Sequence, residues 1–336
     1  MNVETSQKSN ERPTRGRKHP PQGEGGYDVG WYPVCKSEEV ALGQVIARDF
    51  FDGHVAVWRG QNGELSVVSP FCRHMGADLT VGGKVVDNTL QCPFHLWKYD
   101  RSGKVVEIPV GDPIPPRACL FKFPVAERYG VVWIFNGEEA LFDPPTMDIP
   151  EEDAVWRVYG PIKIDMDPCF QFANLMDFQH LQMLHKLEIE RYPDVEFGKY
   201  GLVARNAVMV DNNRGVREKI SVTSKITGTN ILSFGGVFNG GEMYFMMGAT
   251  PQPNIRAHNW LITATRKGGD PEITAQALEF GEKWSLALIV DDDQPIMNAS
   301  SFRFDQLSKS DKYVGEFAKY LSKYPRAHPS QDFICR

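Results

Sequence analysis

The chain has 336 residues, of which 42% are hydrophobic and 24% are charged, a balance typical of a globular protein long enough for two domains. Its 43 acidic and 37 basic residues give a net charge of −6, which argues against a nucleic-acid-binding surface and favours a protein partner with a basic patch. No run of residues is apolar enough to predict a membrane span.

The first 26 residues are polar and basic and are rich in Gly and Pro. Because they lack the apolar core of a targeting peptide, we expect residues 1–26 to form a disordered arm. Apart from Cys72 and Cys92, the cysteines show no disulfide-like spacing; these are Cys35, Cys119, Cys169 and Cys335. They predict reduced thiols and therefore a cytoplasmic protein.

Short stretches of alternating apolar residues, separated by turns, run from Trp31 to Phe135. Val55–Trp58 and Val131–Phe135 are examples, and Gln61-Asn62-Gly63 has the composition of a hairpin turn. We therefore predict an all-β domain over residues 27–142.

A Pro-rich passage over residues 142–152 predicts a linker to a second domain, residues 143–336. This part begins with a helical pattern from Phe170 to Leu187 and ends with a helix over Asp311–Lys323. Strand-like runs lie between the two helical segments. These runs include Ala204–Val210 and Leu261–Arg266. The predicted fold class is α+β.

Two clamps of mixed ligands lie in the first domain: Cys72-Arg73-His74 and, seventeen residues later, Cys92-Pro93-Phe94-His95. Two thiolates can hold one iron of a [2Fe–2S] cluster while two imidazoles hold the other, as in a Rieske centre. Cys72, His74, Cys92 and His95 are therefore the predicted cluster ligands. Tetrahedral zinc is the alternative, but zinc motifs usually pair Cys with Cys and His with His.

The helical stretch of the second domain contains His180 and His185, and two imidazoles with one carboxylate suit a mononuclear iron site with open positions for O₂ and substrate. A regular helix separates positions i and i+5 by about 140°. We therefore expect a π-type turn between Leu181 and Leu184. Asp177 precedes His180 by three residues, and we expect its carboxylate to accept the ring N–H of a liganding imidazole.

The third iron ligand is expected from Asp291-Asp292-Asp293, which follows an apolar helical pattern. Apolar residues flank these acids on both sides, so at least one carboxylate should point inward. We choose Asp293, with Asp292 as the second candidate.

With both motifs placed, residues 27–300 resemble the terminal oxygenase (α) subunits of the Rieske non-haem iron oxygenases. Asn174, Asp177, His180 and His185 match the family's iron motif, which implies that Asn174 and Asp177 belong to the catalytic site. The segment that begins at Asp293 resembles the family's carboxylate-ligand segment. The resemblance implies a helix-grip catalytic domain, in which an antiparallel sheet surrounds a helix, and a head-to-tail homotrimer. In this trimer, His95 or His74 of one chain would contact Asp177 of the next.

The chain contains no Gly-rich dinucleotide loop, so NADH would deliver electrons indirectly, through a separate ferredoxin or flavin reductase. The expected reaction is O₂-dependent monooxygenation or oxidative demethylation of an apolar, ring-bearing small molecule, with a [2Fe–2S] cluster and a mononuclear Fe(II) as cofactors. Arene dihydroxylation at the same sites is one alternative. A Rieske electron carrier without mononuclear iron is another, and a zinc-stapled structural protein is a third.

The cluster loop Cys72-Arg73-His74-Met75-Gly76 is similar to that of ketosteroid hydroxylase oxygenases, which suggests a steroid-like substrate. Aromatic and Met side chains further along the chain are candidates for an apolar substrate wall, although strand core is the alternative for most of them. These candidates are Phe234, Phe238, Met243, Tyr244, Phe245, Met246 and Met247.

Overall fold

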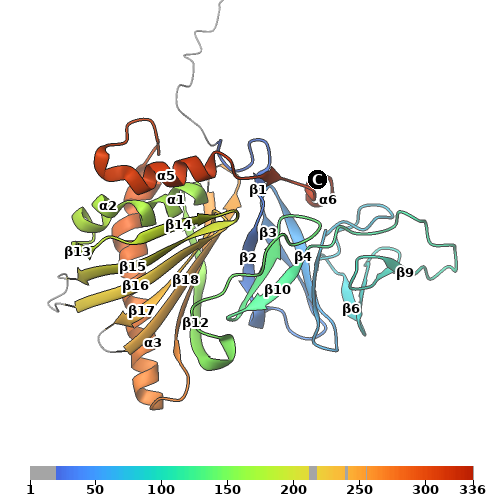
Figure 1. Ribbon diagram of the computed structural model, residues 1–336. Helices are drawn as coiled ribbons and strands as arrows, with labels where there is room; N and C mark the ends of the chain where they lie inside the picture. Colours follow the sequence, from blue (N-terminus) through green and yellow to red (C-terminus); the bar gives the residue numbers. More distant parts are fainter. Residues whose placement is uncertain (1–19, 212–217, 239–240, 255, 336) are drawn as a thin grey trace, which may run out of the picture.

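The computed structural model describes residues 20–211, 218–238, 241–254 and 256–335. It confirms the α+β class: small β-sheets form the N-terminal part, and one large antiparallel sheet packed with helices forms the rest (Figure 1). The two parts lie side by side, with the cluster loops at the end far from the large sheet.

Three antiparallel sheets make up the N-terminal part. The first has the order β10-β11-β2, with β2 at Trp31–Lys36, β10 at Val125–Arg128 and β11 at Val131–Phe135. The second has the order β3-β4-β5, with β3 at Val45–Phe50, β4 at Gly53–Arg59 and β5 at Leu65–Val68. The third has the order β6-β7-β8-β9, with β6 at Lys84–Val86, β7 at Thr89–Gln91, β8 at Lys98–Tyr99 and β9 at Val105–Glu107. A 3₁₀ turn, η1, covers Ser37–Glu39. The predicted strands Val55–Trp58 and Val131–Phe135 are confirmed.

The large sheet has the order β12-β19-β18-β17-β16-β15-β13, and β14 pairs with β15. Its strands are β12 (Ala154–Ile164), β13 (Leu187–Arg191), β14 (Asp194–Gly198), β15 (Gly201–Asp211), β16 (Glu218–Thr227), β17 (Ile231–Phe238), β18 (Gly241–Gln252) and β19 (Arg256–Arg266). The runs Ala204–Val210 and Leu261–Arg266 are thus strands, as expected.

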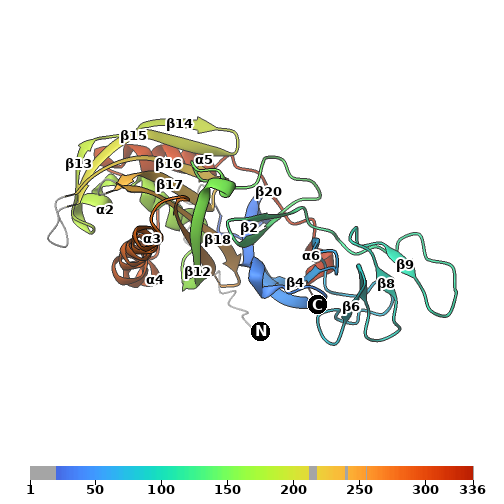
Figure 2. The ribbon, with the colours of Figure 1, turned by 90° about the horizontal axis from the view of Figure 1, so that it is seen from below.

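Helices cover one face of this sheet (Figure 2). They are α1 (Pro168–Ala173), α2 (Phe178–Met183), α3 (Pro271–Leu286), α4 (Gln294–Ala299) and α5 (Lys312–Leu321). Short turns are η2 (Glu151–Asp153), η3 (Asn174–Met176) and η6 (Lys309–Asp311), and a π-helix, η5, covers Ala287–Asp293. The helix grip and the final helix are confirmed, but the helical stretch from Phe170 to Leu187 is divided into three pieces.

Strand β18 contacts the helices with one face and the N-terminal part with the other. Phe245, Met247 and Ala249 pack with the helices, whereas Tyr244 and Met246 pack against Trp133 of β11 and neighbouring residues. Alternate side chains of a strand point to opposite faces, so the same strand lines the helix side and holds the N-terminal part in place.

The segment predicted as a linker is packed rather than free. Met147 and Ile149 are buried in the core shared by the two parts, and the indole N–H of Trp31 donates to the carbonyl of Phe142. The predicted division at residue 142 therefore lies within a continuous apolar core, and it stays a prediction.

Both ends of the described chain meet at the junction of the two parts. Strand β1 (Tyr27–Asp28) pairs with β20 (Arg326–Ala327), and a short helix, α6 (Gln331–Ile334), brings Ile334 into the N-terminal core. Residues 1–19 of the predicted arm lie outside the described residues. Residues 20–26 differ from the expected disorder, because Arg326 donates to three of their carbonyl groups.

None of the helices in the described part of the chain combines the length and the apolar character needed to cross a membrane.

Candidate metal centres

The four predicted cluster ligands lie on two loops of similar construction. Cys72 follows β5 and Cys92 follows β7. Each cysteine N–H donates to the carbonyl five residues later, Ala77 at 2.8 Å and Trp97 at 2.9 Å. Gly76 permits the first loop to turn, since its φ is +74°. The two clamps therefore present their side chains from matching tight turns.

The sulfur and nitrogen donors of the four predicted cluster ligands differ in their exposure to solvent. Both cysteines are buried, at 3% and 1%, in a core that includes Trp58 and Tyr99, whereas His74 and His95 are exposed. The Nδ1 atoms of the two imidazoles lie 3.2 Å apart. Trp97 stacks on the His74 ring at a centroid distance of 4.6 Å. Sulfur thus faces the protein interior, and the imidazoles face solvent.

The chemistry of this donor set fits a [2Fe–2S] cluster. Burial raises the pKa of the Cys92 thiol, the backbone N–H groups of Phe94 and His95 lower it, and the neighbouring Cys72 sulfur raises it, so that the net pKa lies above its ordinary value. Two sulfurs and two facing imidazoles are the ligand set that a Rieske cluster requires. Iron binds such sulfurs as thiolates.

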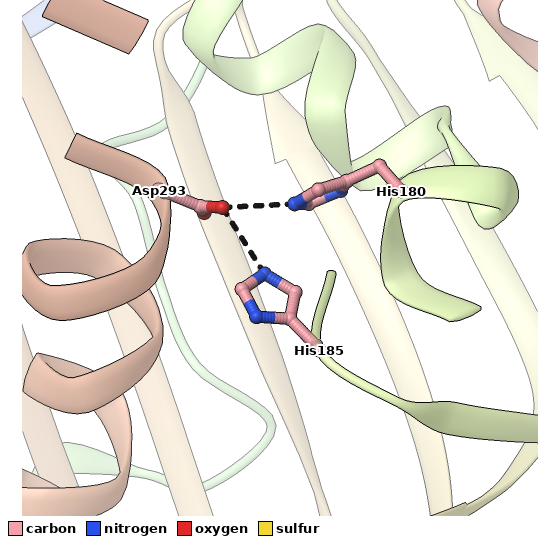
Figure 3. A group of neighbouring side chains, drawn as sticks. All are labelled: His180, His185 and Asp293. Carbon is pink, nitrogen blue, oxygen red and sulfur yellow. Dashed lines mark hydrogen bonds and ion pairs between the residues drawn. The ribbon is translucent and has the colours of Figure 1, made fainter. Parts of the chain in front are cut away.

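The second centre brings together His180, His185 and Asp293, whose ligand atoms all lie within 4.8 Å of one another (Figure 3). The Oδ1 atom of Asp293 lies 2.8 Å from His180 Nε2 and 3.1 Å from His185 Nε2. The three side chains come from α2, the turn that follows it and the end of the π-helix. Two nitrogens and one carboxylate on one side of an open space can hold a mononuclear iron.

The second nitrogen of each imidazole also has a partner. His180 Nδ1 lies 3.3 Å from the carbonyl oxygen of Asn174, and His185 Nδ1 lies 3.2 Å from Asp292 Oδ2. Such contacts fix the orientation of a liganding imidazole and leave Nε2 free for the metal. Asp292 therefore lies behind His185, while Asp293 lies in the group of three.

Charge in this group is consistent with these contacts. Burial lowers the pKa of His185, but its hydrogen bonds with Asp293 and Asp292 outweigh burial and raise it overall. Burial raises the pKa of Asp293, and the two imidazoles outweigh this effect, so its pKa is lowered. The carboxylate is therefore ionised and able to bind a cation.

The π-type turn lies elsewhere than expected. Leu181 to Met183 belong to a regular helix that ends before His185, so no widening is needed between the two histidines. The π-helix η5 instead ends at Asp293. In a regular α-helix, four residues turn the chain by about 40° more than a full circle, so side chains spaced four apart move gradually around the helix. The wider turn of a π-helix reduces this rotation. Ser285, Ile289 and Asp293 thereby all face one cavity.

Asp177 also differs from expectation. Its carboxylate accepts the backbone N–H of His180 at 3.0 Å, as the N-cap of α2, and the ring of His180 contacts the Asn174 carbonyl instead. Asp177 lines a second cleft, the outer cleft, which also reaches the proposed ligands His180 and Asp293.

A mainly apolar cavity adjoins the three residues. Phe234, Phe238, Phe245 and Met247 of the predicted wall line it. Met243, Tyr244 and Met246 are buried outside the lining, the last two because they point to the other face of β18. Trp284, Gln171 and Ser285 also line the cavity. The sequence gives no signal for these three, because only the path of α1 and α3 decides which of their side chains face inward.

Comparison with known proteins identifies one domain and several relatives. A family model described as the Rieske [2Fe–2S] domain matches residues 30–124. The chain is 31% identical over 189 residues to the cholesterol 7-desaturase of Bombyx mori, covering 53% of this chain and 40% of that protein. It is 31% identical over 166 residues to a probable 3-ketosteroid-9-alpha-monooxygenase oxygenase component of Rhodococcus rhodochrous, covering 47% and 41%. The chain thus spans about two fifths of the length of these relatives.

A solved structure shares the fold of most of the chain. NdmA of Pseudomonas putida CBB5, as the QL mutant with caffeine, superimposes with a TM-score of 0.66, covering 87% of this chain and 89% of that one at 21% identity. The likeness therefore includes the large sheet and its helices as well as the small β-sheets.

Proposed function

Because the chain carries a Rieske [2Fe–2S] domain, is related to oxygenase components and has the fold of Rieske oxygenases, we propose that it is the terminal oxygenase of a Rieske oxygenase system. We propose that it catalyses O₂-dependent monooxygenation or oxidative demethylation of an apolar, ring-bearing molecule. In the net reaction, O₂, two electrons and two protons convert a C–H bond into a C–OH group and water.

One observation carries this proposal: His180, His185 and Asp293 meet at the wall of an apolar cavity. An electron carrier needs no second metal centre and no cavity beside it. Bound at these residues, an iron ion would bind and activate O₂, and a cluster at Cys72, His74, Cys92 and His95 would supply electrons one at a time.

Residues of the protein orient the proposed metal ligands and keep water out of the cavity. Asn174 and Asp292 orient the two imidazoles through their second nitrogens. Phe234, Phe245 and Trp284 give the cavity walls that exclude water and hold a ring beside the metal ligands. No side chain is required as a nucleophile.

The elements that carry the two centres lie in different parts of the molecule: β6 in the N-terminal part, away from the large sheet, and α2 beside that sheet (Figures 1 and 2). We propose that electrons cross between chains of a head-to-tail homotrimer, in which His74 or His95 of one chain approaches Asp177 of the next. The position of Asp177 in the outer cleft beside His180 supports this arrangement. Sedimentation equilibrium tests it, because a monomeric active enzyme would exclude it.

We further propose that a ferredoxin or flavin reductase passes electrons from NADH to the exposed imidazole edge of the cluster site. We propose a reducing compartment such as the cytoplasm, because none of the six cysteines is joined in a disulfide and two of them are the proposed thiolate ligands of the cluster.

Iron and acid-labile sulfide per chain, measured after anaerobic purification, test the proposal first. About three irons and two sulfides would mean that both centres are occupied. About two of each, even after ferrous iron is added, would favour the electron carrier. With ¹⁸O₂ and a substrate, one labelled oxygen in the product indicates hydroxylation, and two indicate arene dihydroxylation. An unlabelled product released together with formaldehyde indicates oxidative demethylation, because the labelled oxygen leaves in the formaldehyde. An unlabelled product that has lost two hydrogens, with no formaldehyde, would indicate desaturation, the activity for which the Bombyx mori relative is named.

A further inference from the structure

Three buried polar residues that the proposed reaction does not use line the cavity beside the proposed iron site: Gln171, Ser224 and Ser285. Two of them, Gln171 of α1 and Ser285 of α3, have a buried polar atom without a hydrogen-bond partner in the described structure, and each of these two residues is 3% exposed. Both side chains line the cavity, whose other walls are mostly apolar.

Gln171 is held at one end only. Its side-chain N–H donates to the carbonyl of Met166 at 2.7 Å, which fixes the orientation of the amide. Its Oε1 atom, in contrast, is buried without a hydrogen-bond partner among the residues that the structure describes. A buried amide oxygen of this kind costs about 1–3 kcal/mol when it stays unpaired, so a ligand that donates a hydrogen bond would relieve it.

Ser285 supplies the second group. Its hydroxyl is also buried and, within the described part of the chain, has no hydrogen-bond partner. A hydroxyl can donate or accept, so it can pair with either a hydroxyl or a carbonyl group of a ligand. Asp293 lies two helical turns further along and faces the same cavity, which places the proposed metal ligand and this hydroxyl on one wall.

The cavity offers no positive side chain to an anionic ligand. Among the described residues that line it, the titratable ones are only His180, His185 and Asp293, and none is Lys or Arg. Away from the proposed iron site, a carboxylate that entered this apolar space would lose its hydration without a cationic side chain to pair with.

From these observations, and resting on the proposed oxygenase function, we propose that Gln171 and Ser285 are specificity-determining residues. They bind the hydroxyl group of a substrate that is otherwise apolar, ring-bearing and uncharged. An apolar ligand without an oxygen leaves both groups unpaired, and a carboxylate ligand meets no Lys or Arg side chain in the lining.

Three probes of equal ring size test this preference: 2-naphthol, naphthalene and 2-naphthoate. Their Kd values are measured by calorimetry on the anaerobic holoenzyme without reductant, so that no turnover occurs. We expect 2-naphthol to bind best, naphthalene about 2- to 10-fold more weakly, and 2-naphthoate most weakly of the three. Equal or tighter binding of 2-naphthoate would overturn the proposal, and so would a failure of all three probes to bind.

Ser285→Ala tests the contact directly. It should abolish the 2- to 10-fold preference for 2-naphthol over naphthalene in whole or large part, with naphthalene affinity unchanged. Because the hydroxyl has no partner in the free protein, its removal should leave the melting temperature equal or higher. A variant that weakens both probes equally would contradict the assignment.

Thr263→Val is the matched control. Thr263 is 1% exposed, and its hydroxyl likewise has no hydrogen-bond partner in the described structure, but it lies on β19 outside the cavity lining. It should leave the ratio of the two affinities unchanged. Gln171→Met, which also loses the bond to Met166, should reduce the same ratio, with the melting temperature showing whether the variant is folded.

Failure of this inference can be told apart from failure of the proposed function. Probe affinities do not depend on turnover, so the preference for 2-naphthol can hold even if no oxygen is incorporated into any product. Conversely, ¹⁸O incorporation into a substrate together with equal binding of all three probes would keep the oxygenase and remove the specificity assignment.

Discussion

The phenolic oxygen of Tyr99 lies 3.1 Å from the sulfur of Cys72. The same oxygen accepts the backbone N–H of Arg73 at 3.0 Å, and a Cys72 thiolate bound to iron can only accept, so in the loaded site the hydroxyl of Tyr99 is the donor to the sulfur. Burial, followed by the Cys72 sulfur, raises the pKa of Tyr99 far above its ordinary value, which keeps this donor protonated.

Tyr99→Phe should therefore lower the reduction potential of the cluster, because a hydrogen bond to a ligand sulfur stabilises the reduced form. A redox titration followed by visible absorbance measures the change. The cluster content should stay at about two irons and two sulfides, since no ligand is removed. A potential equal to that of the native protein would show that the hydroxyl does not bind the coordinated sulfur.

Asp293→Ala should remove the mononuclear iron and leave the cluster. We expect iron to fall from about three to about two per chain, with two sulfides retained, and product formation to fall at least about 100-fold. Asp291→Ala is the control, because it removes the same charge from an exposed neighbour outside the metal group. If Asp291→Ala lost iron equally, the selection of Asp293 would be wrong.

Asp177 should show two separable roles. Asp177→Ala removes the N-cap of α2 and should lower the free energy of unfolding by about 1 kcal/mol, whereas Asn caps nearly as well as Asp. Asp177→Asn should therefore keep stability, iron and sulfide, and yet slow product formation if the carboxylate passes charge between the centres. Single-turnover rates measure this, and a normal rate in Asp177→Asn would exclude the electronic role.

The loop that carries Cys72 should loosen in acid. Burial raises the pKa of Asp78, but hydrogen bonds from Thr80 and the contact with His54 at 2.9 Å outweigh it, so the folded pKa is lowered. A lowered folded pKa gives stability that is present above the unfolded value, about 3.9, and is lost as the pH falls through the folded value.

Asp78→Asn should therefore melt a few degrees below the native protein at pH 6, and this difference should shrink as the pH falls below about 4. Differential scanning calorimetry from pH 6 to pH 3 measures it. Asp112→Asn, at an exposed position of the same domain, provides the comparison and should show no such trend. A difference that grows in acid would reverse the sign and refute the argument.

The sequence was most informative where chemistry restricts residue type. Four cluster ligands of two kinds in two clamps, and alternating strands such as Val131–Phe135, leave few interpretations. The helix over residues 170–187 was harder to predict, because Asp177 adopts a non-helical conformation and divides it. The π-helix before Asp293, the role of Asp292 and the cavity positions of Gln171 and Ser285 depend on tertiary packing, which has no periodic signal in the chain.

The pairing of β1 with β20 also sets an order for folding on the ribosome. Tyr27 cannot pair with Ala327 until about 300 further residues have been synthesised. At 5–20 residues per second, this takes about 15–60 s. The loops of Cys72 and Cys92 are only twenty residues apart, so they can meet within a few seconds. We expect iron–sulfur assembly to begin on the nascent chain, while the core that receives Ile334 closes last and leaves its apolar surface open to chaperones until then.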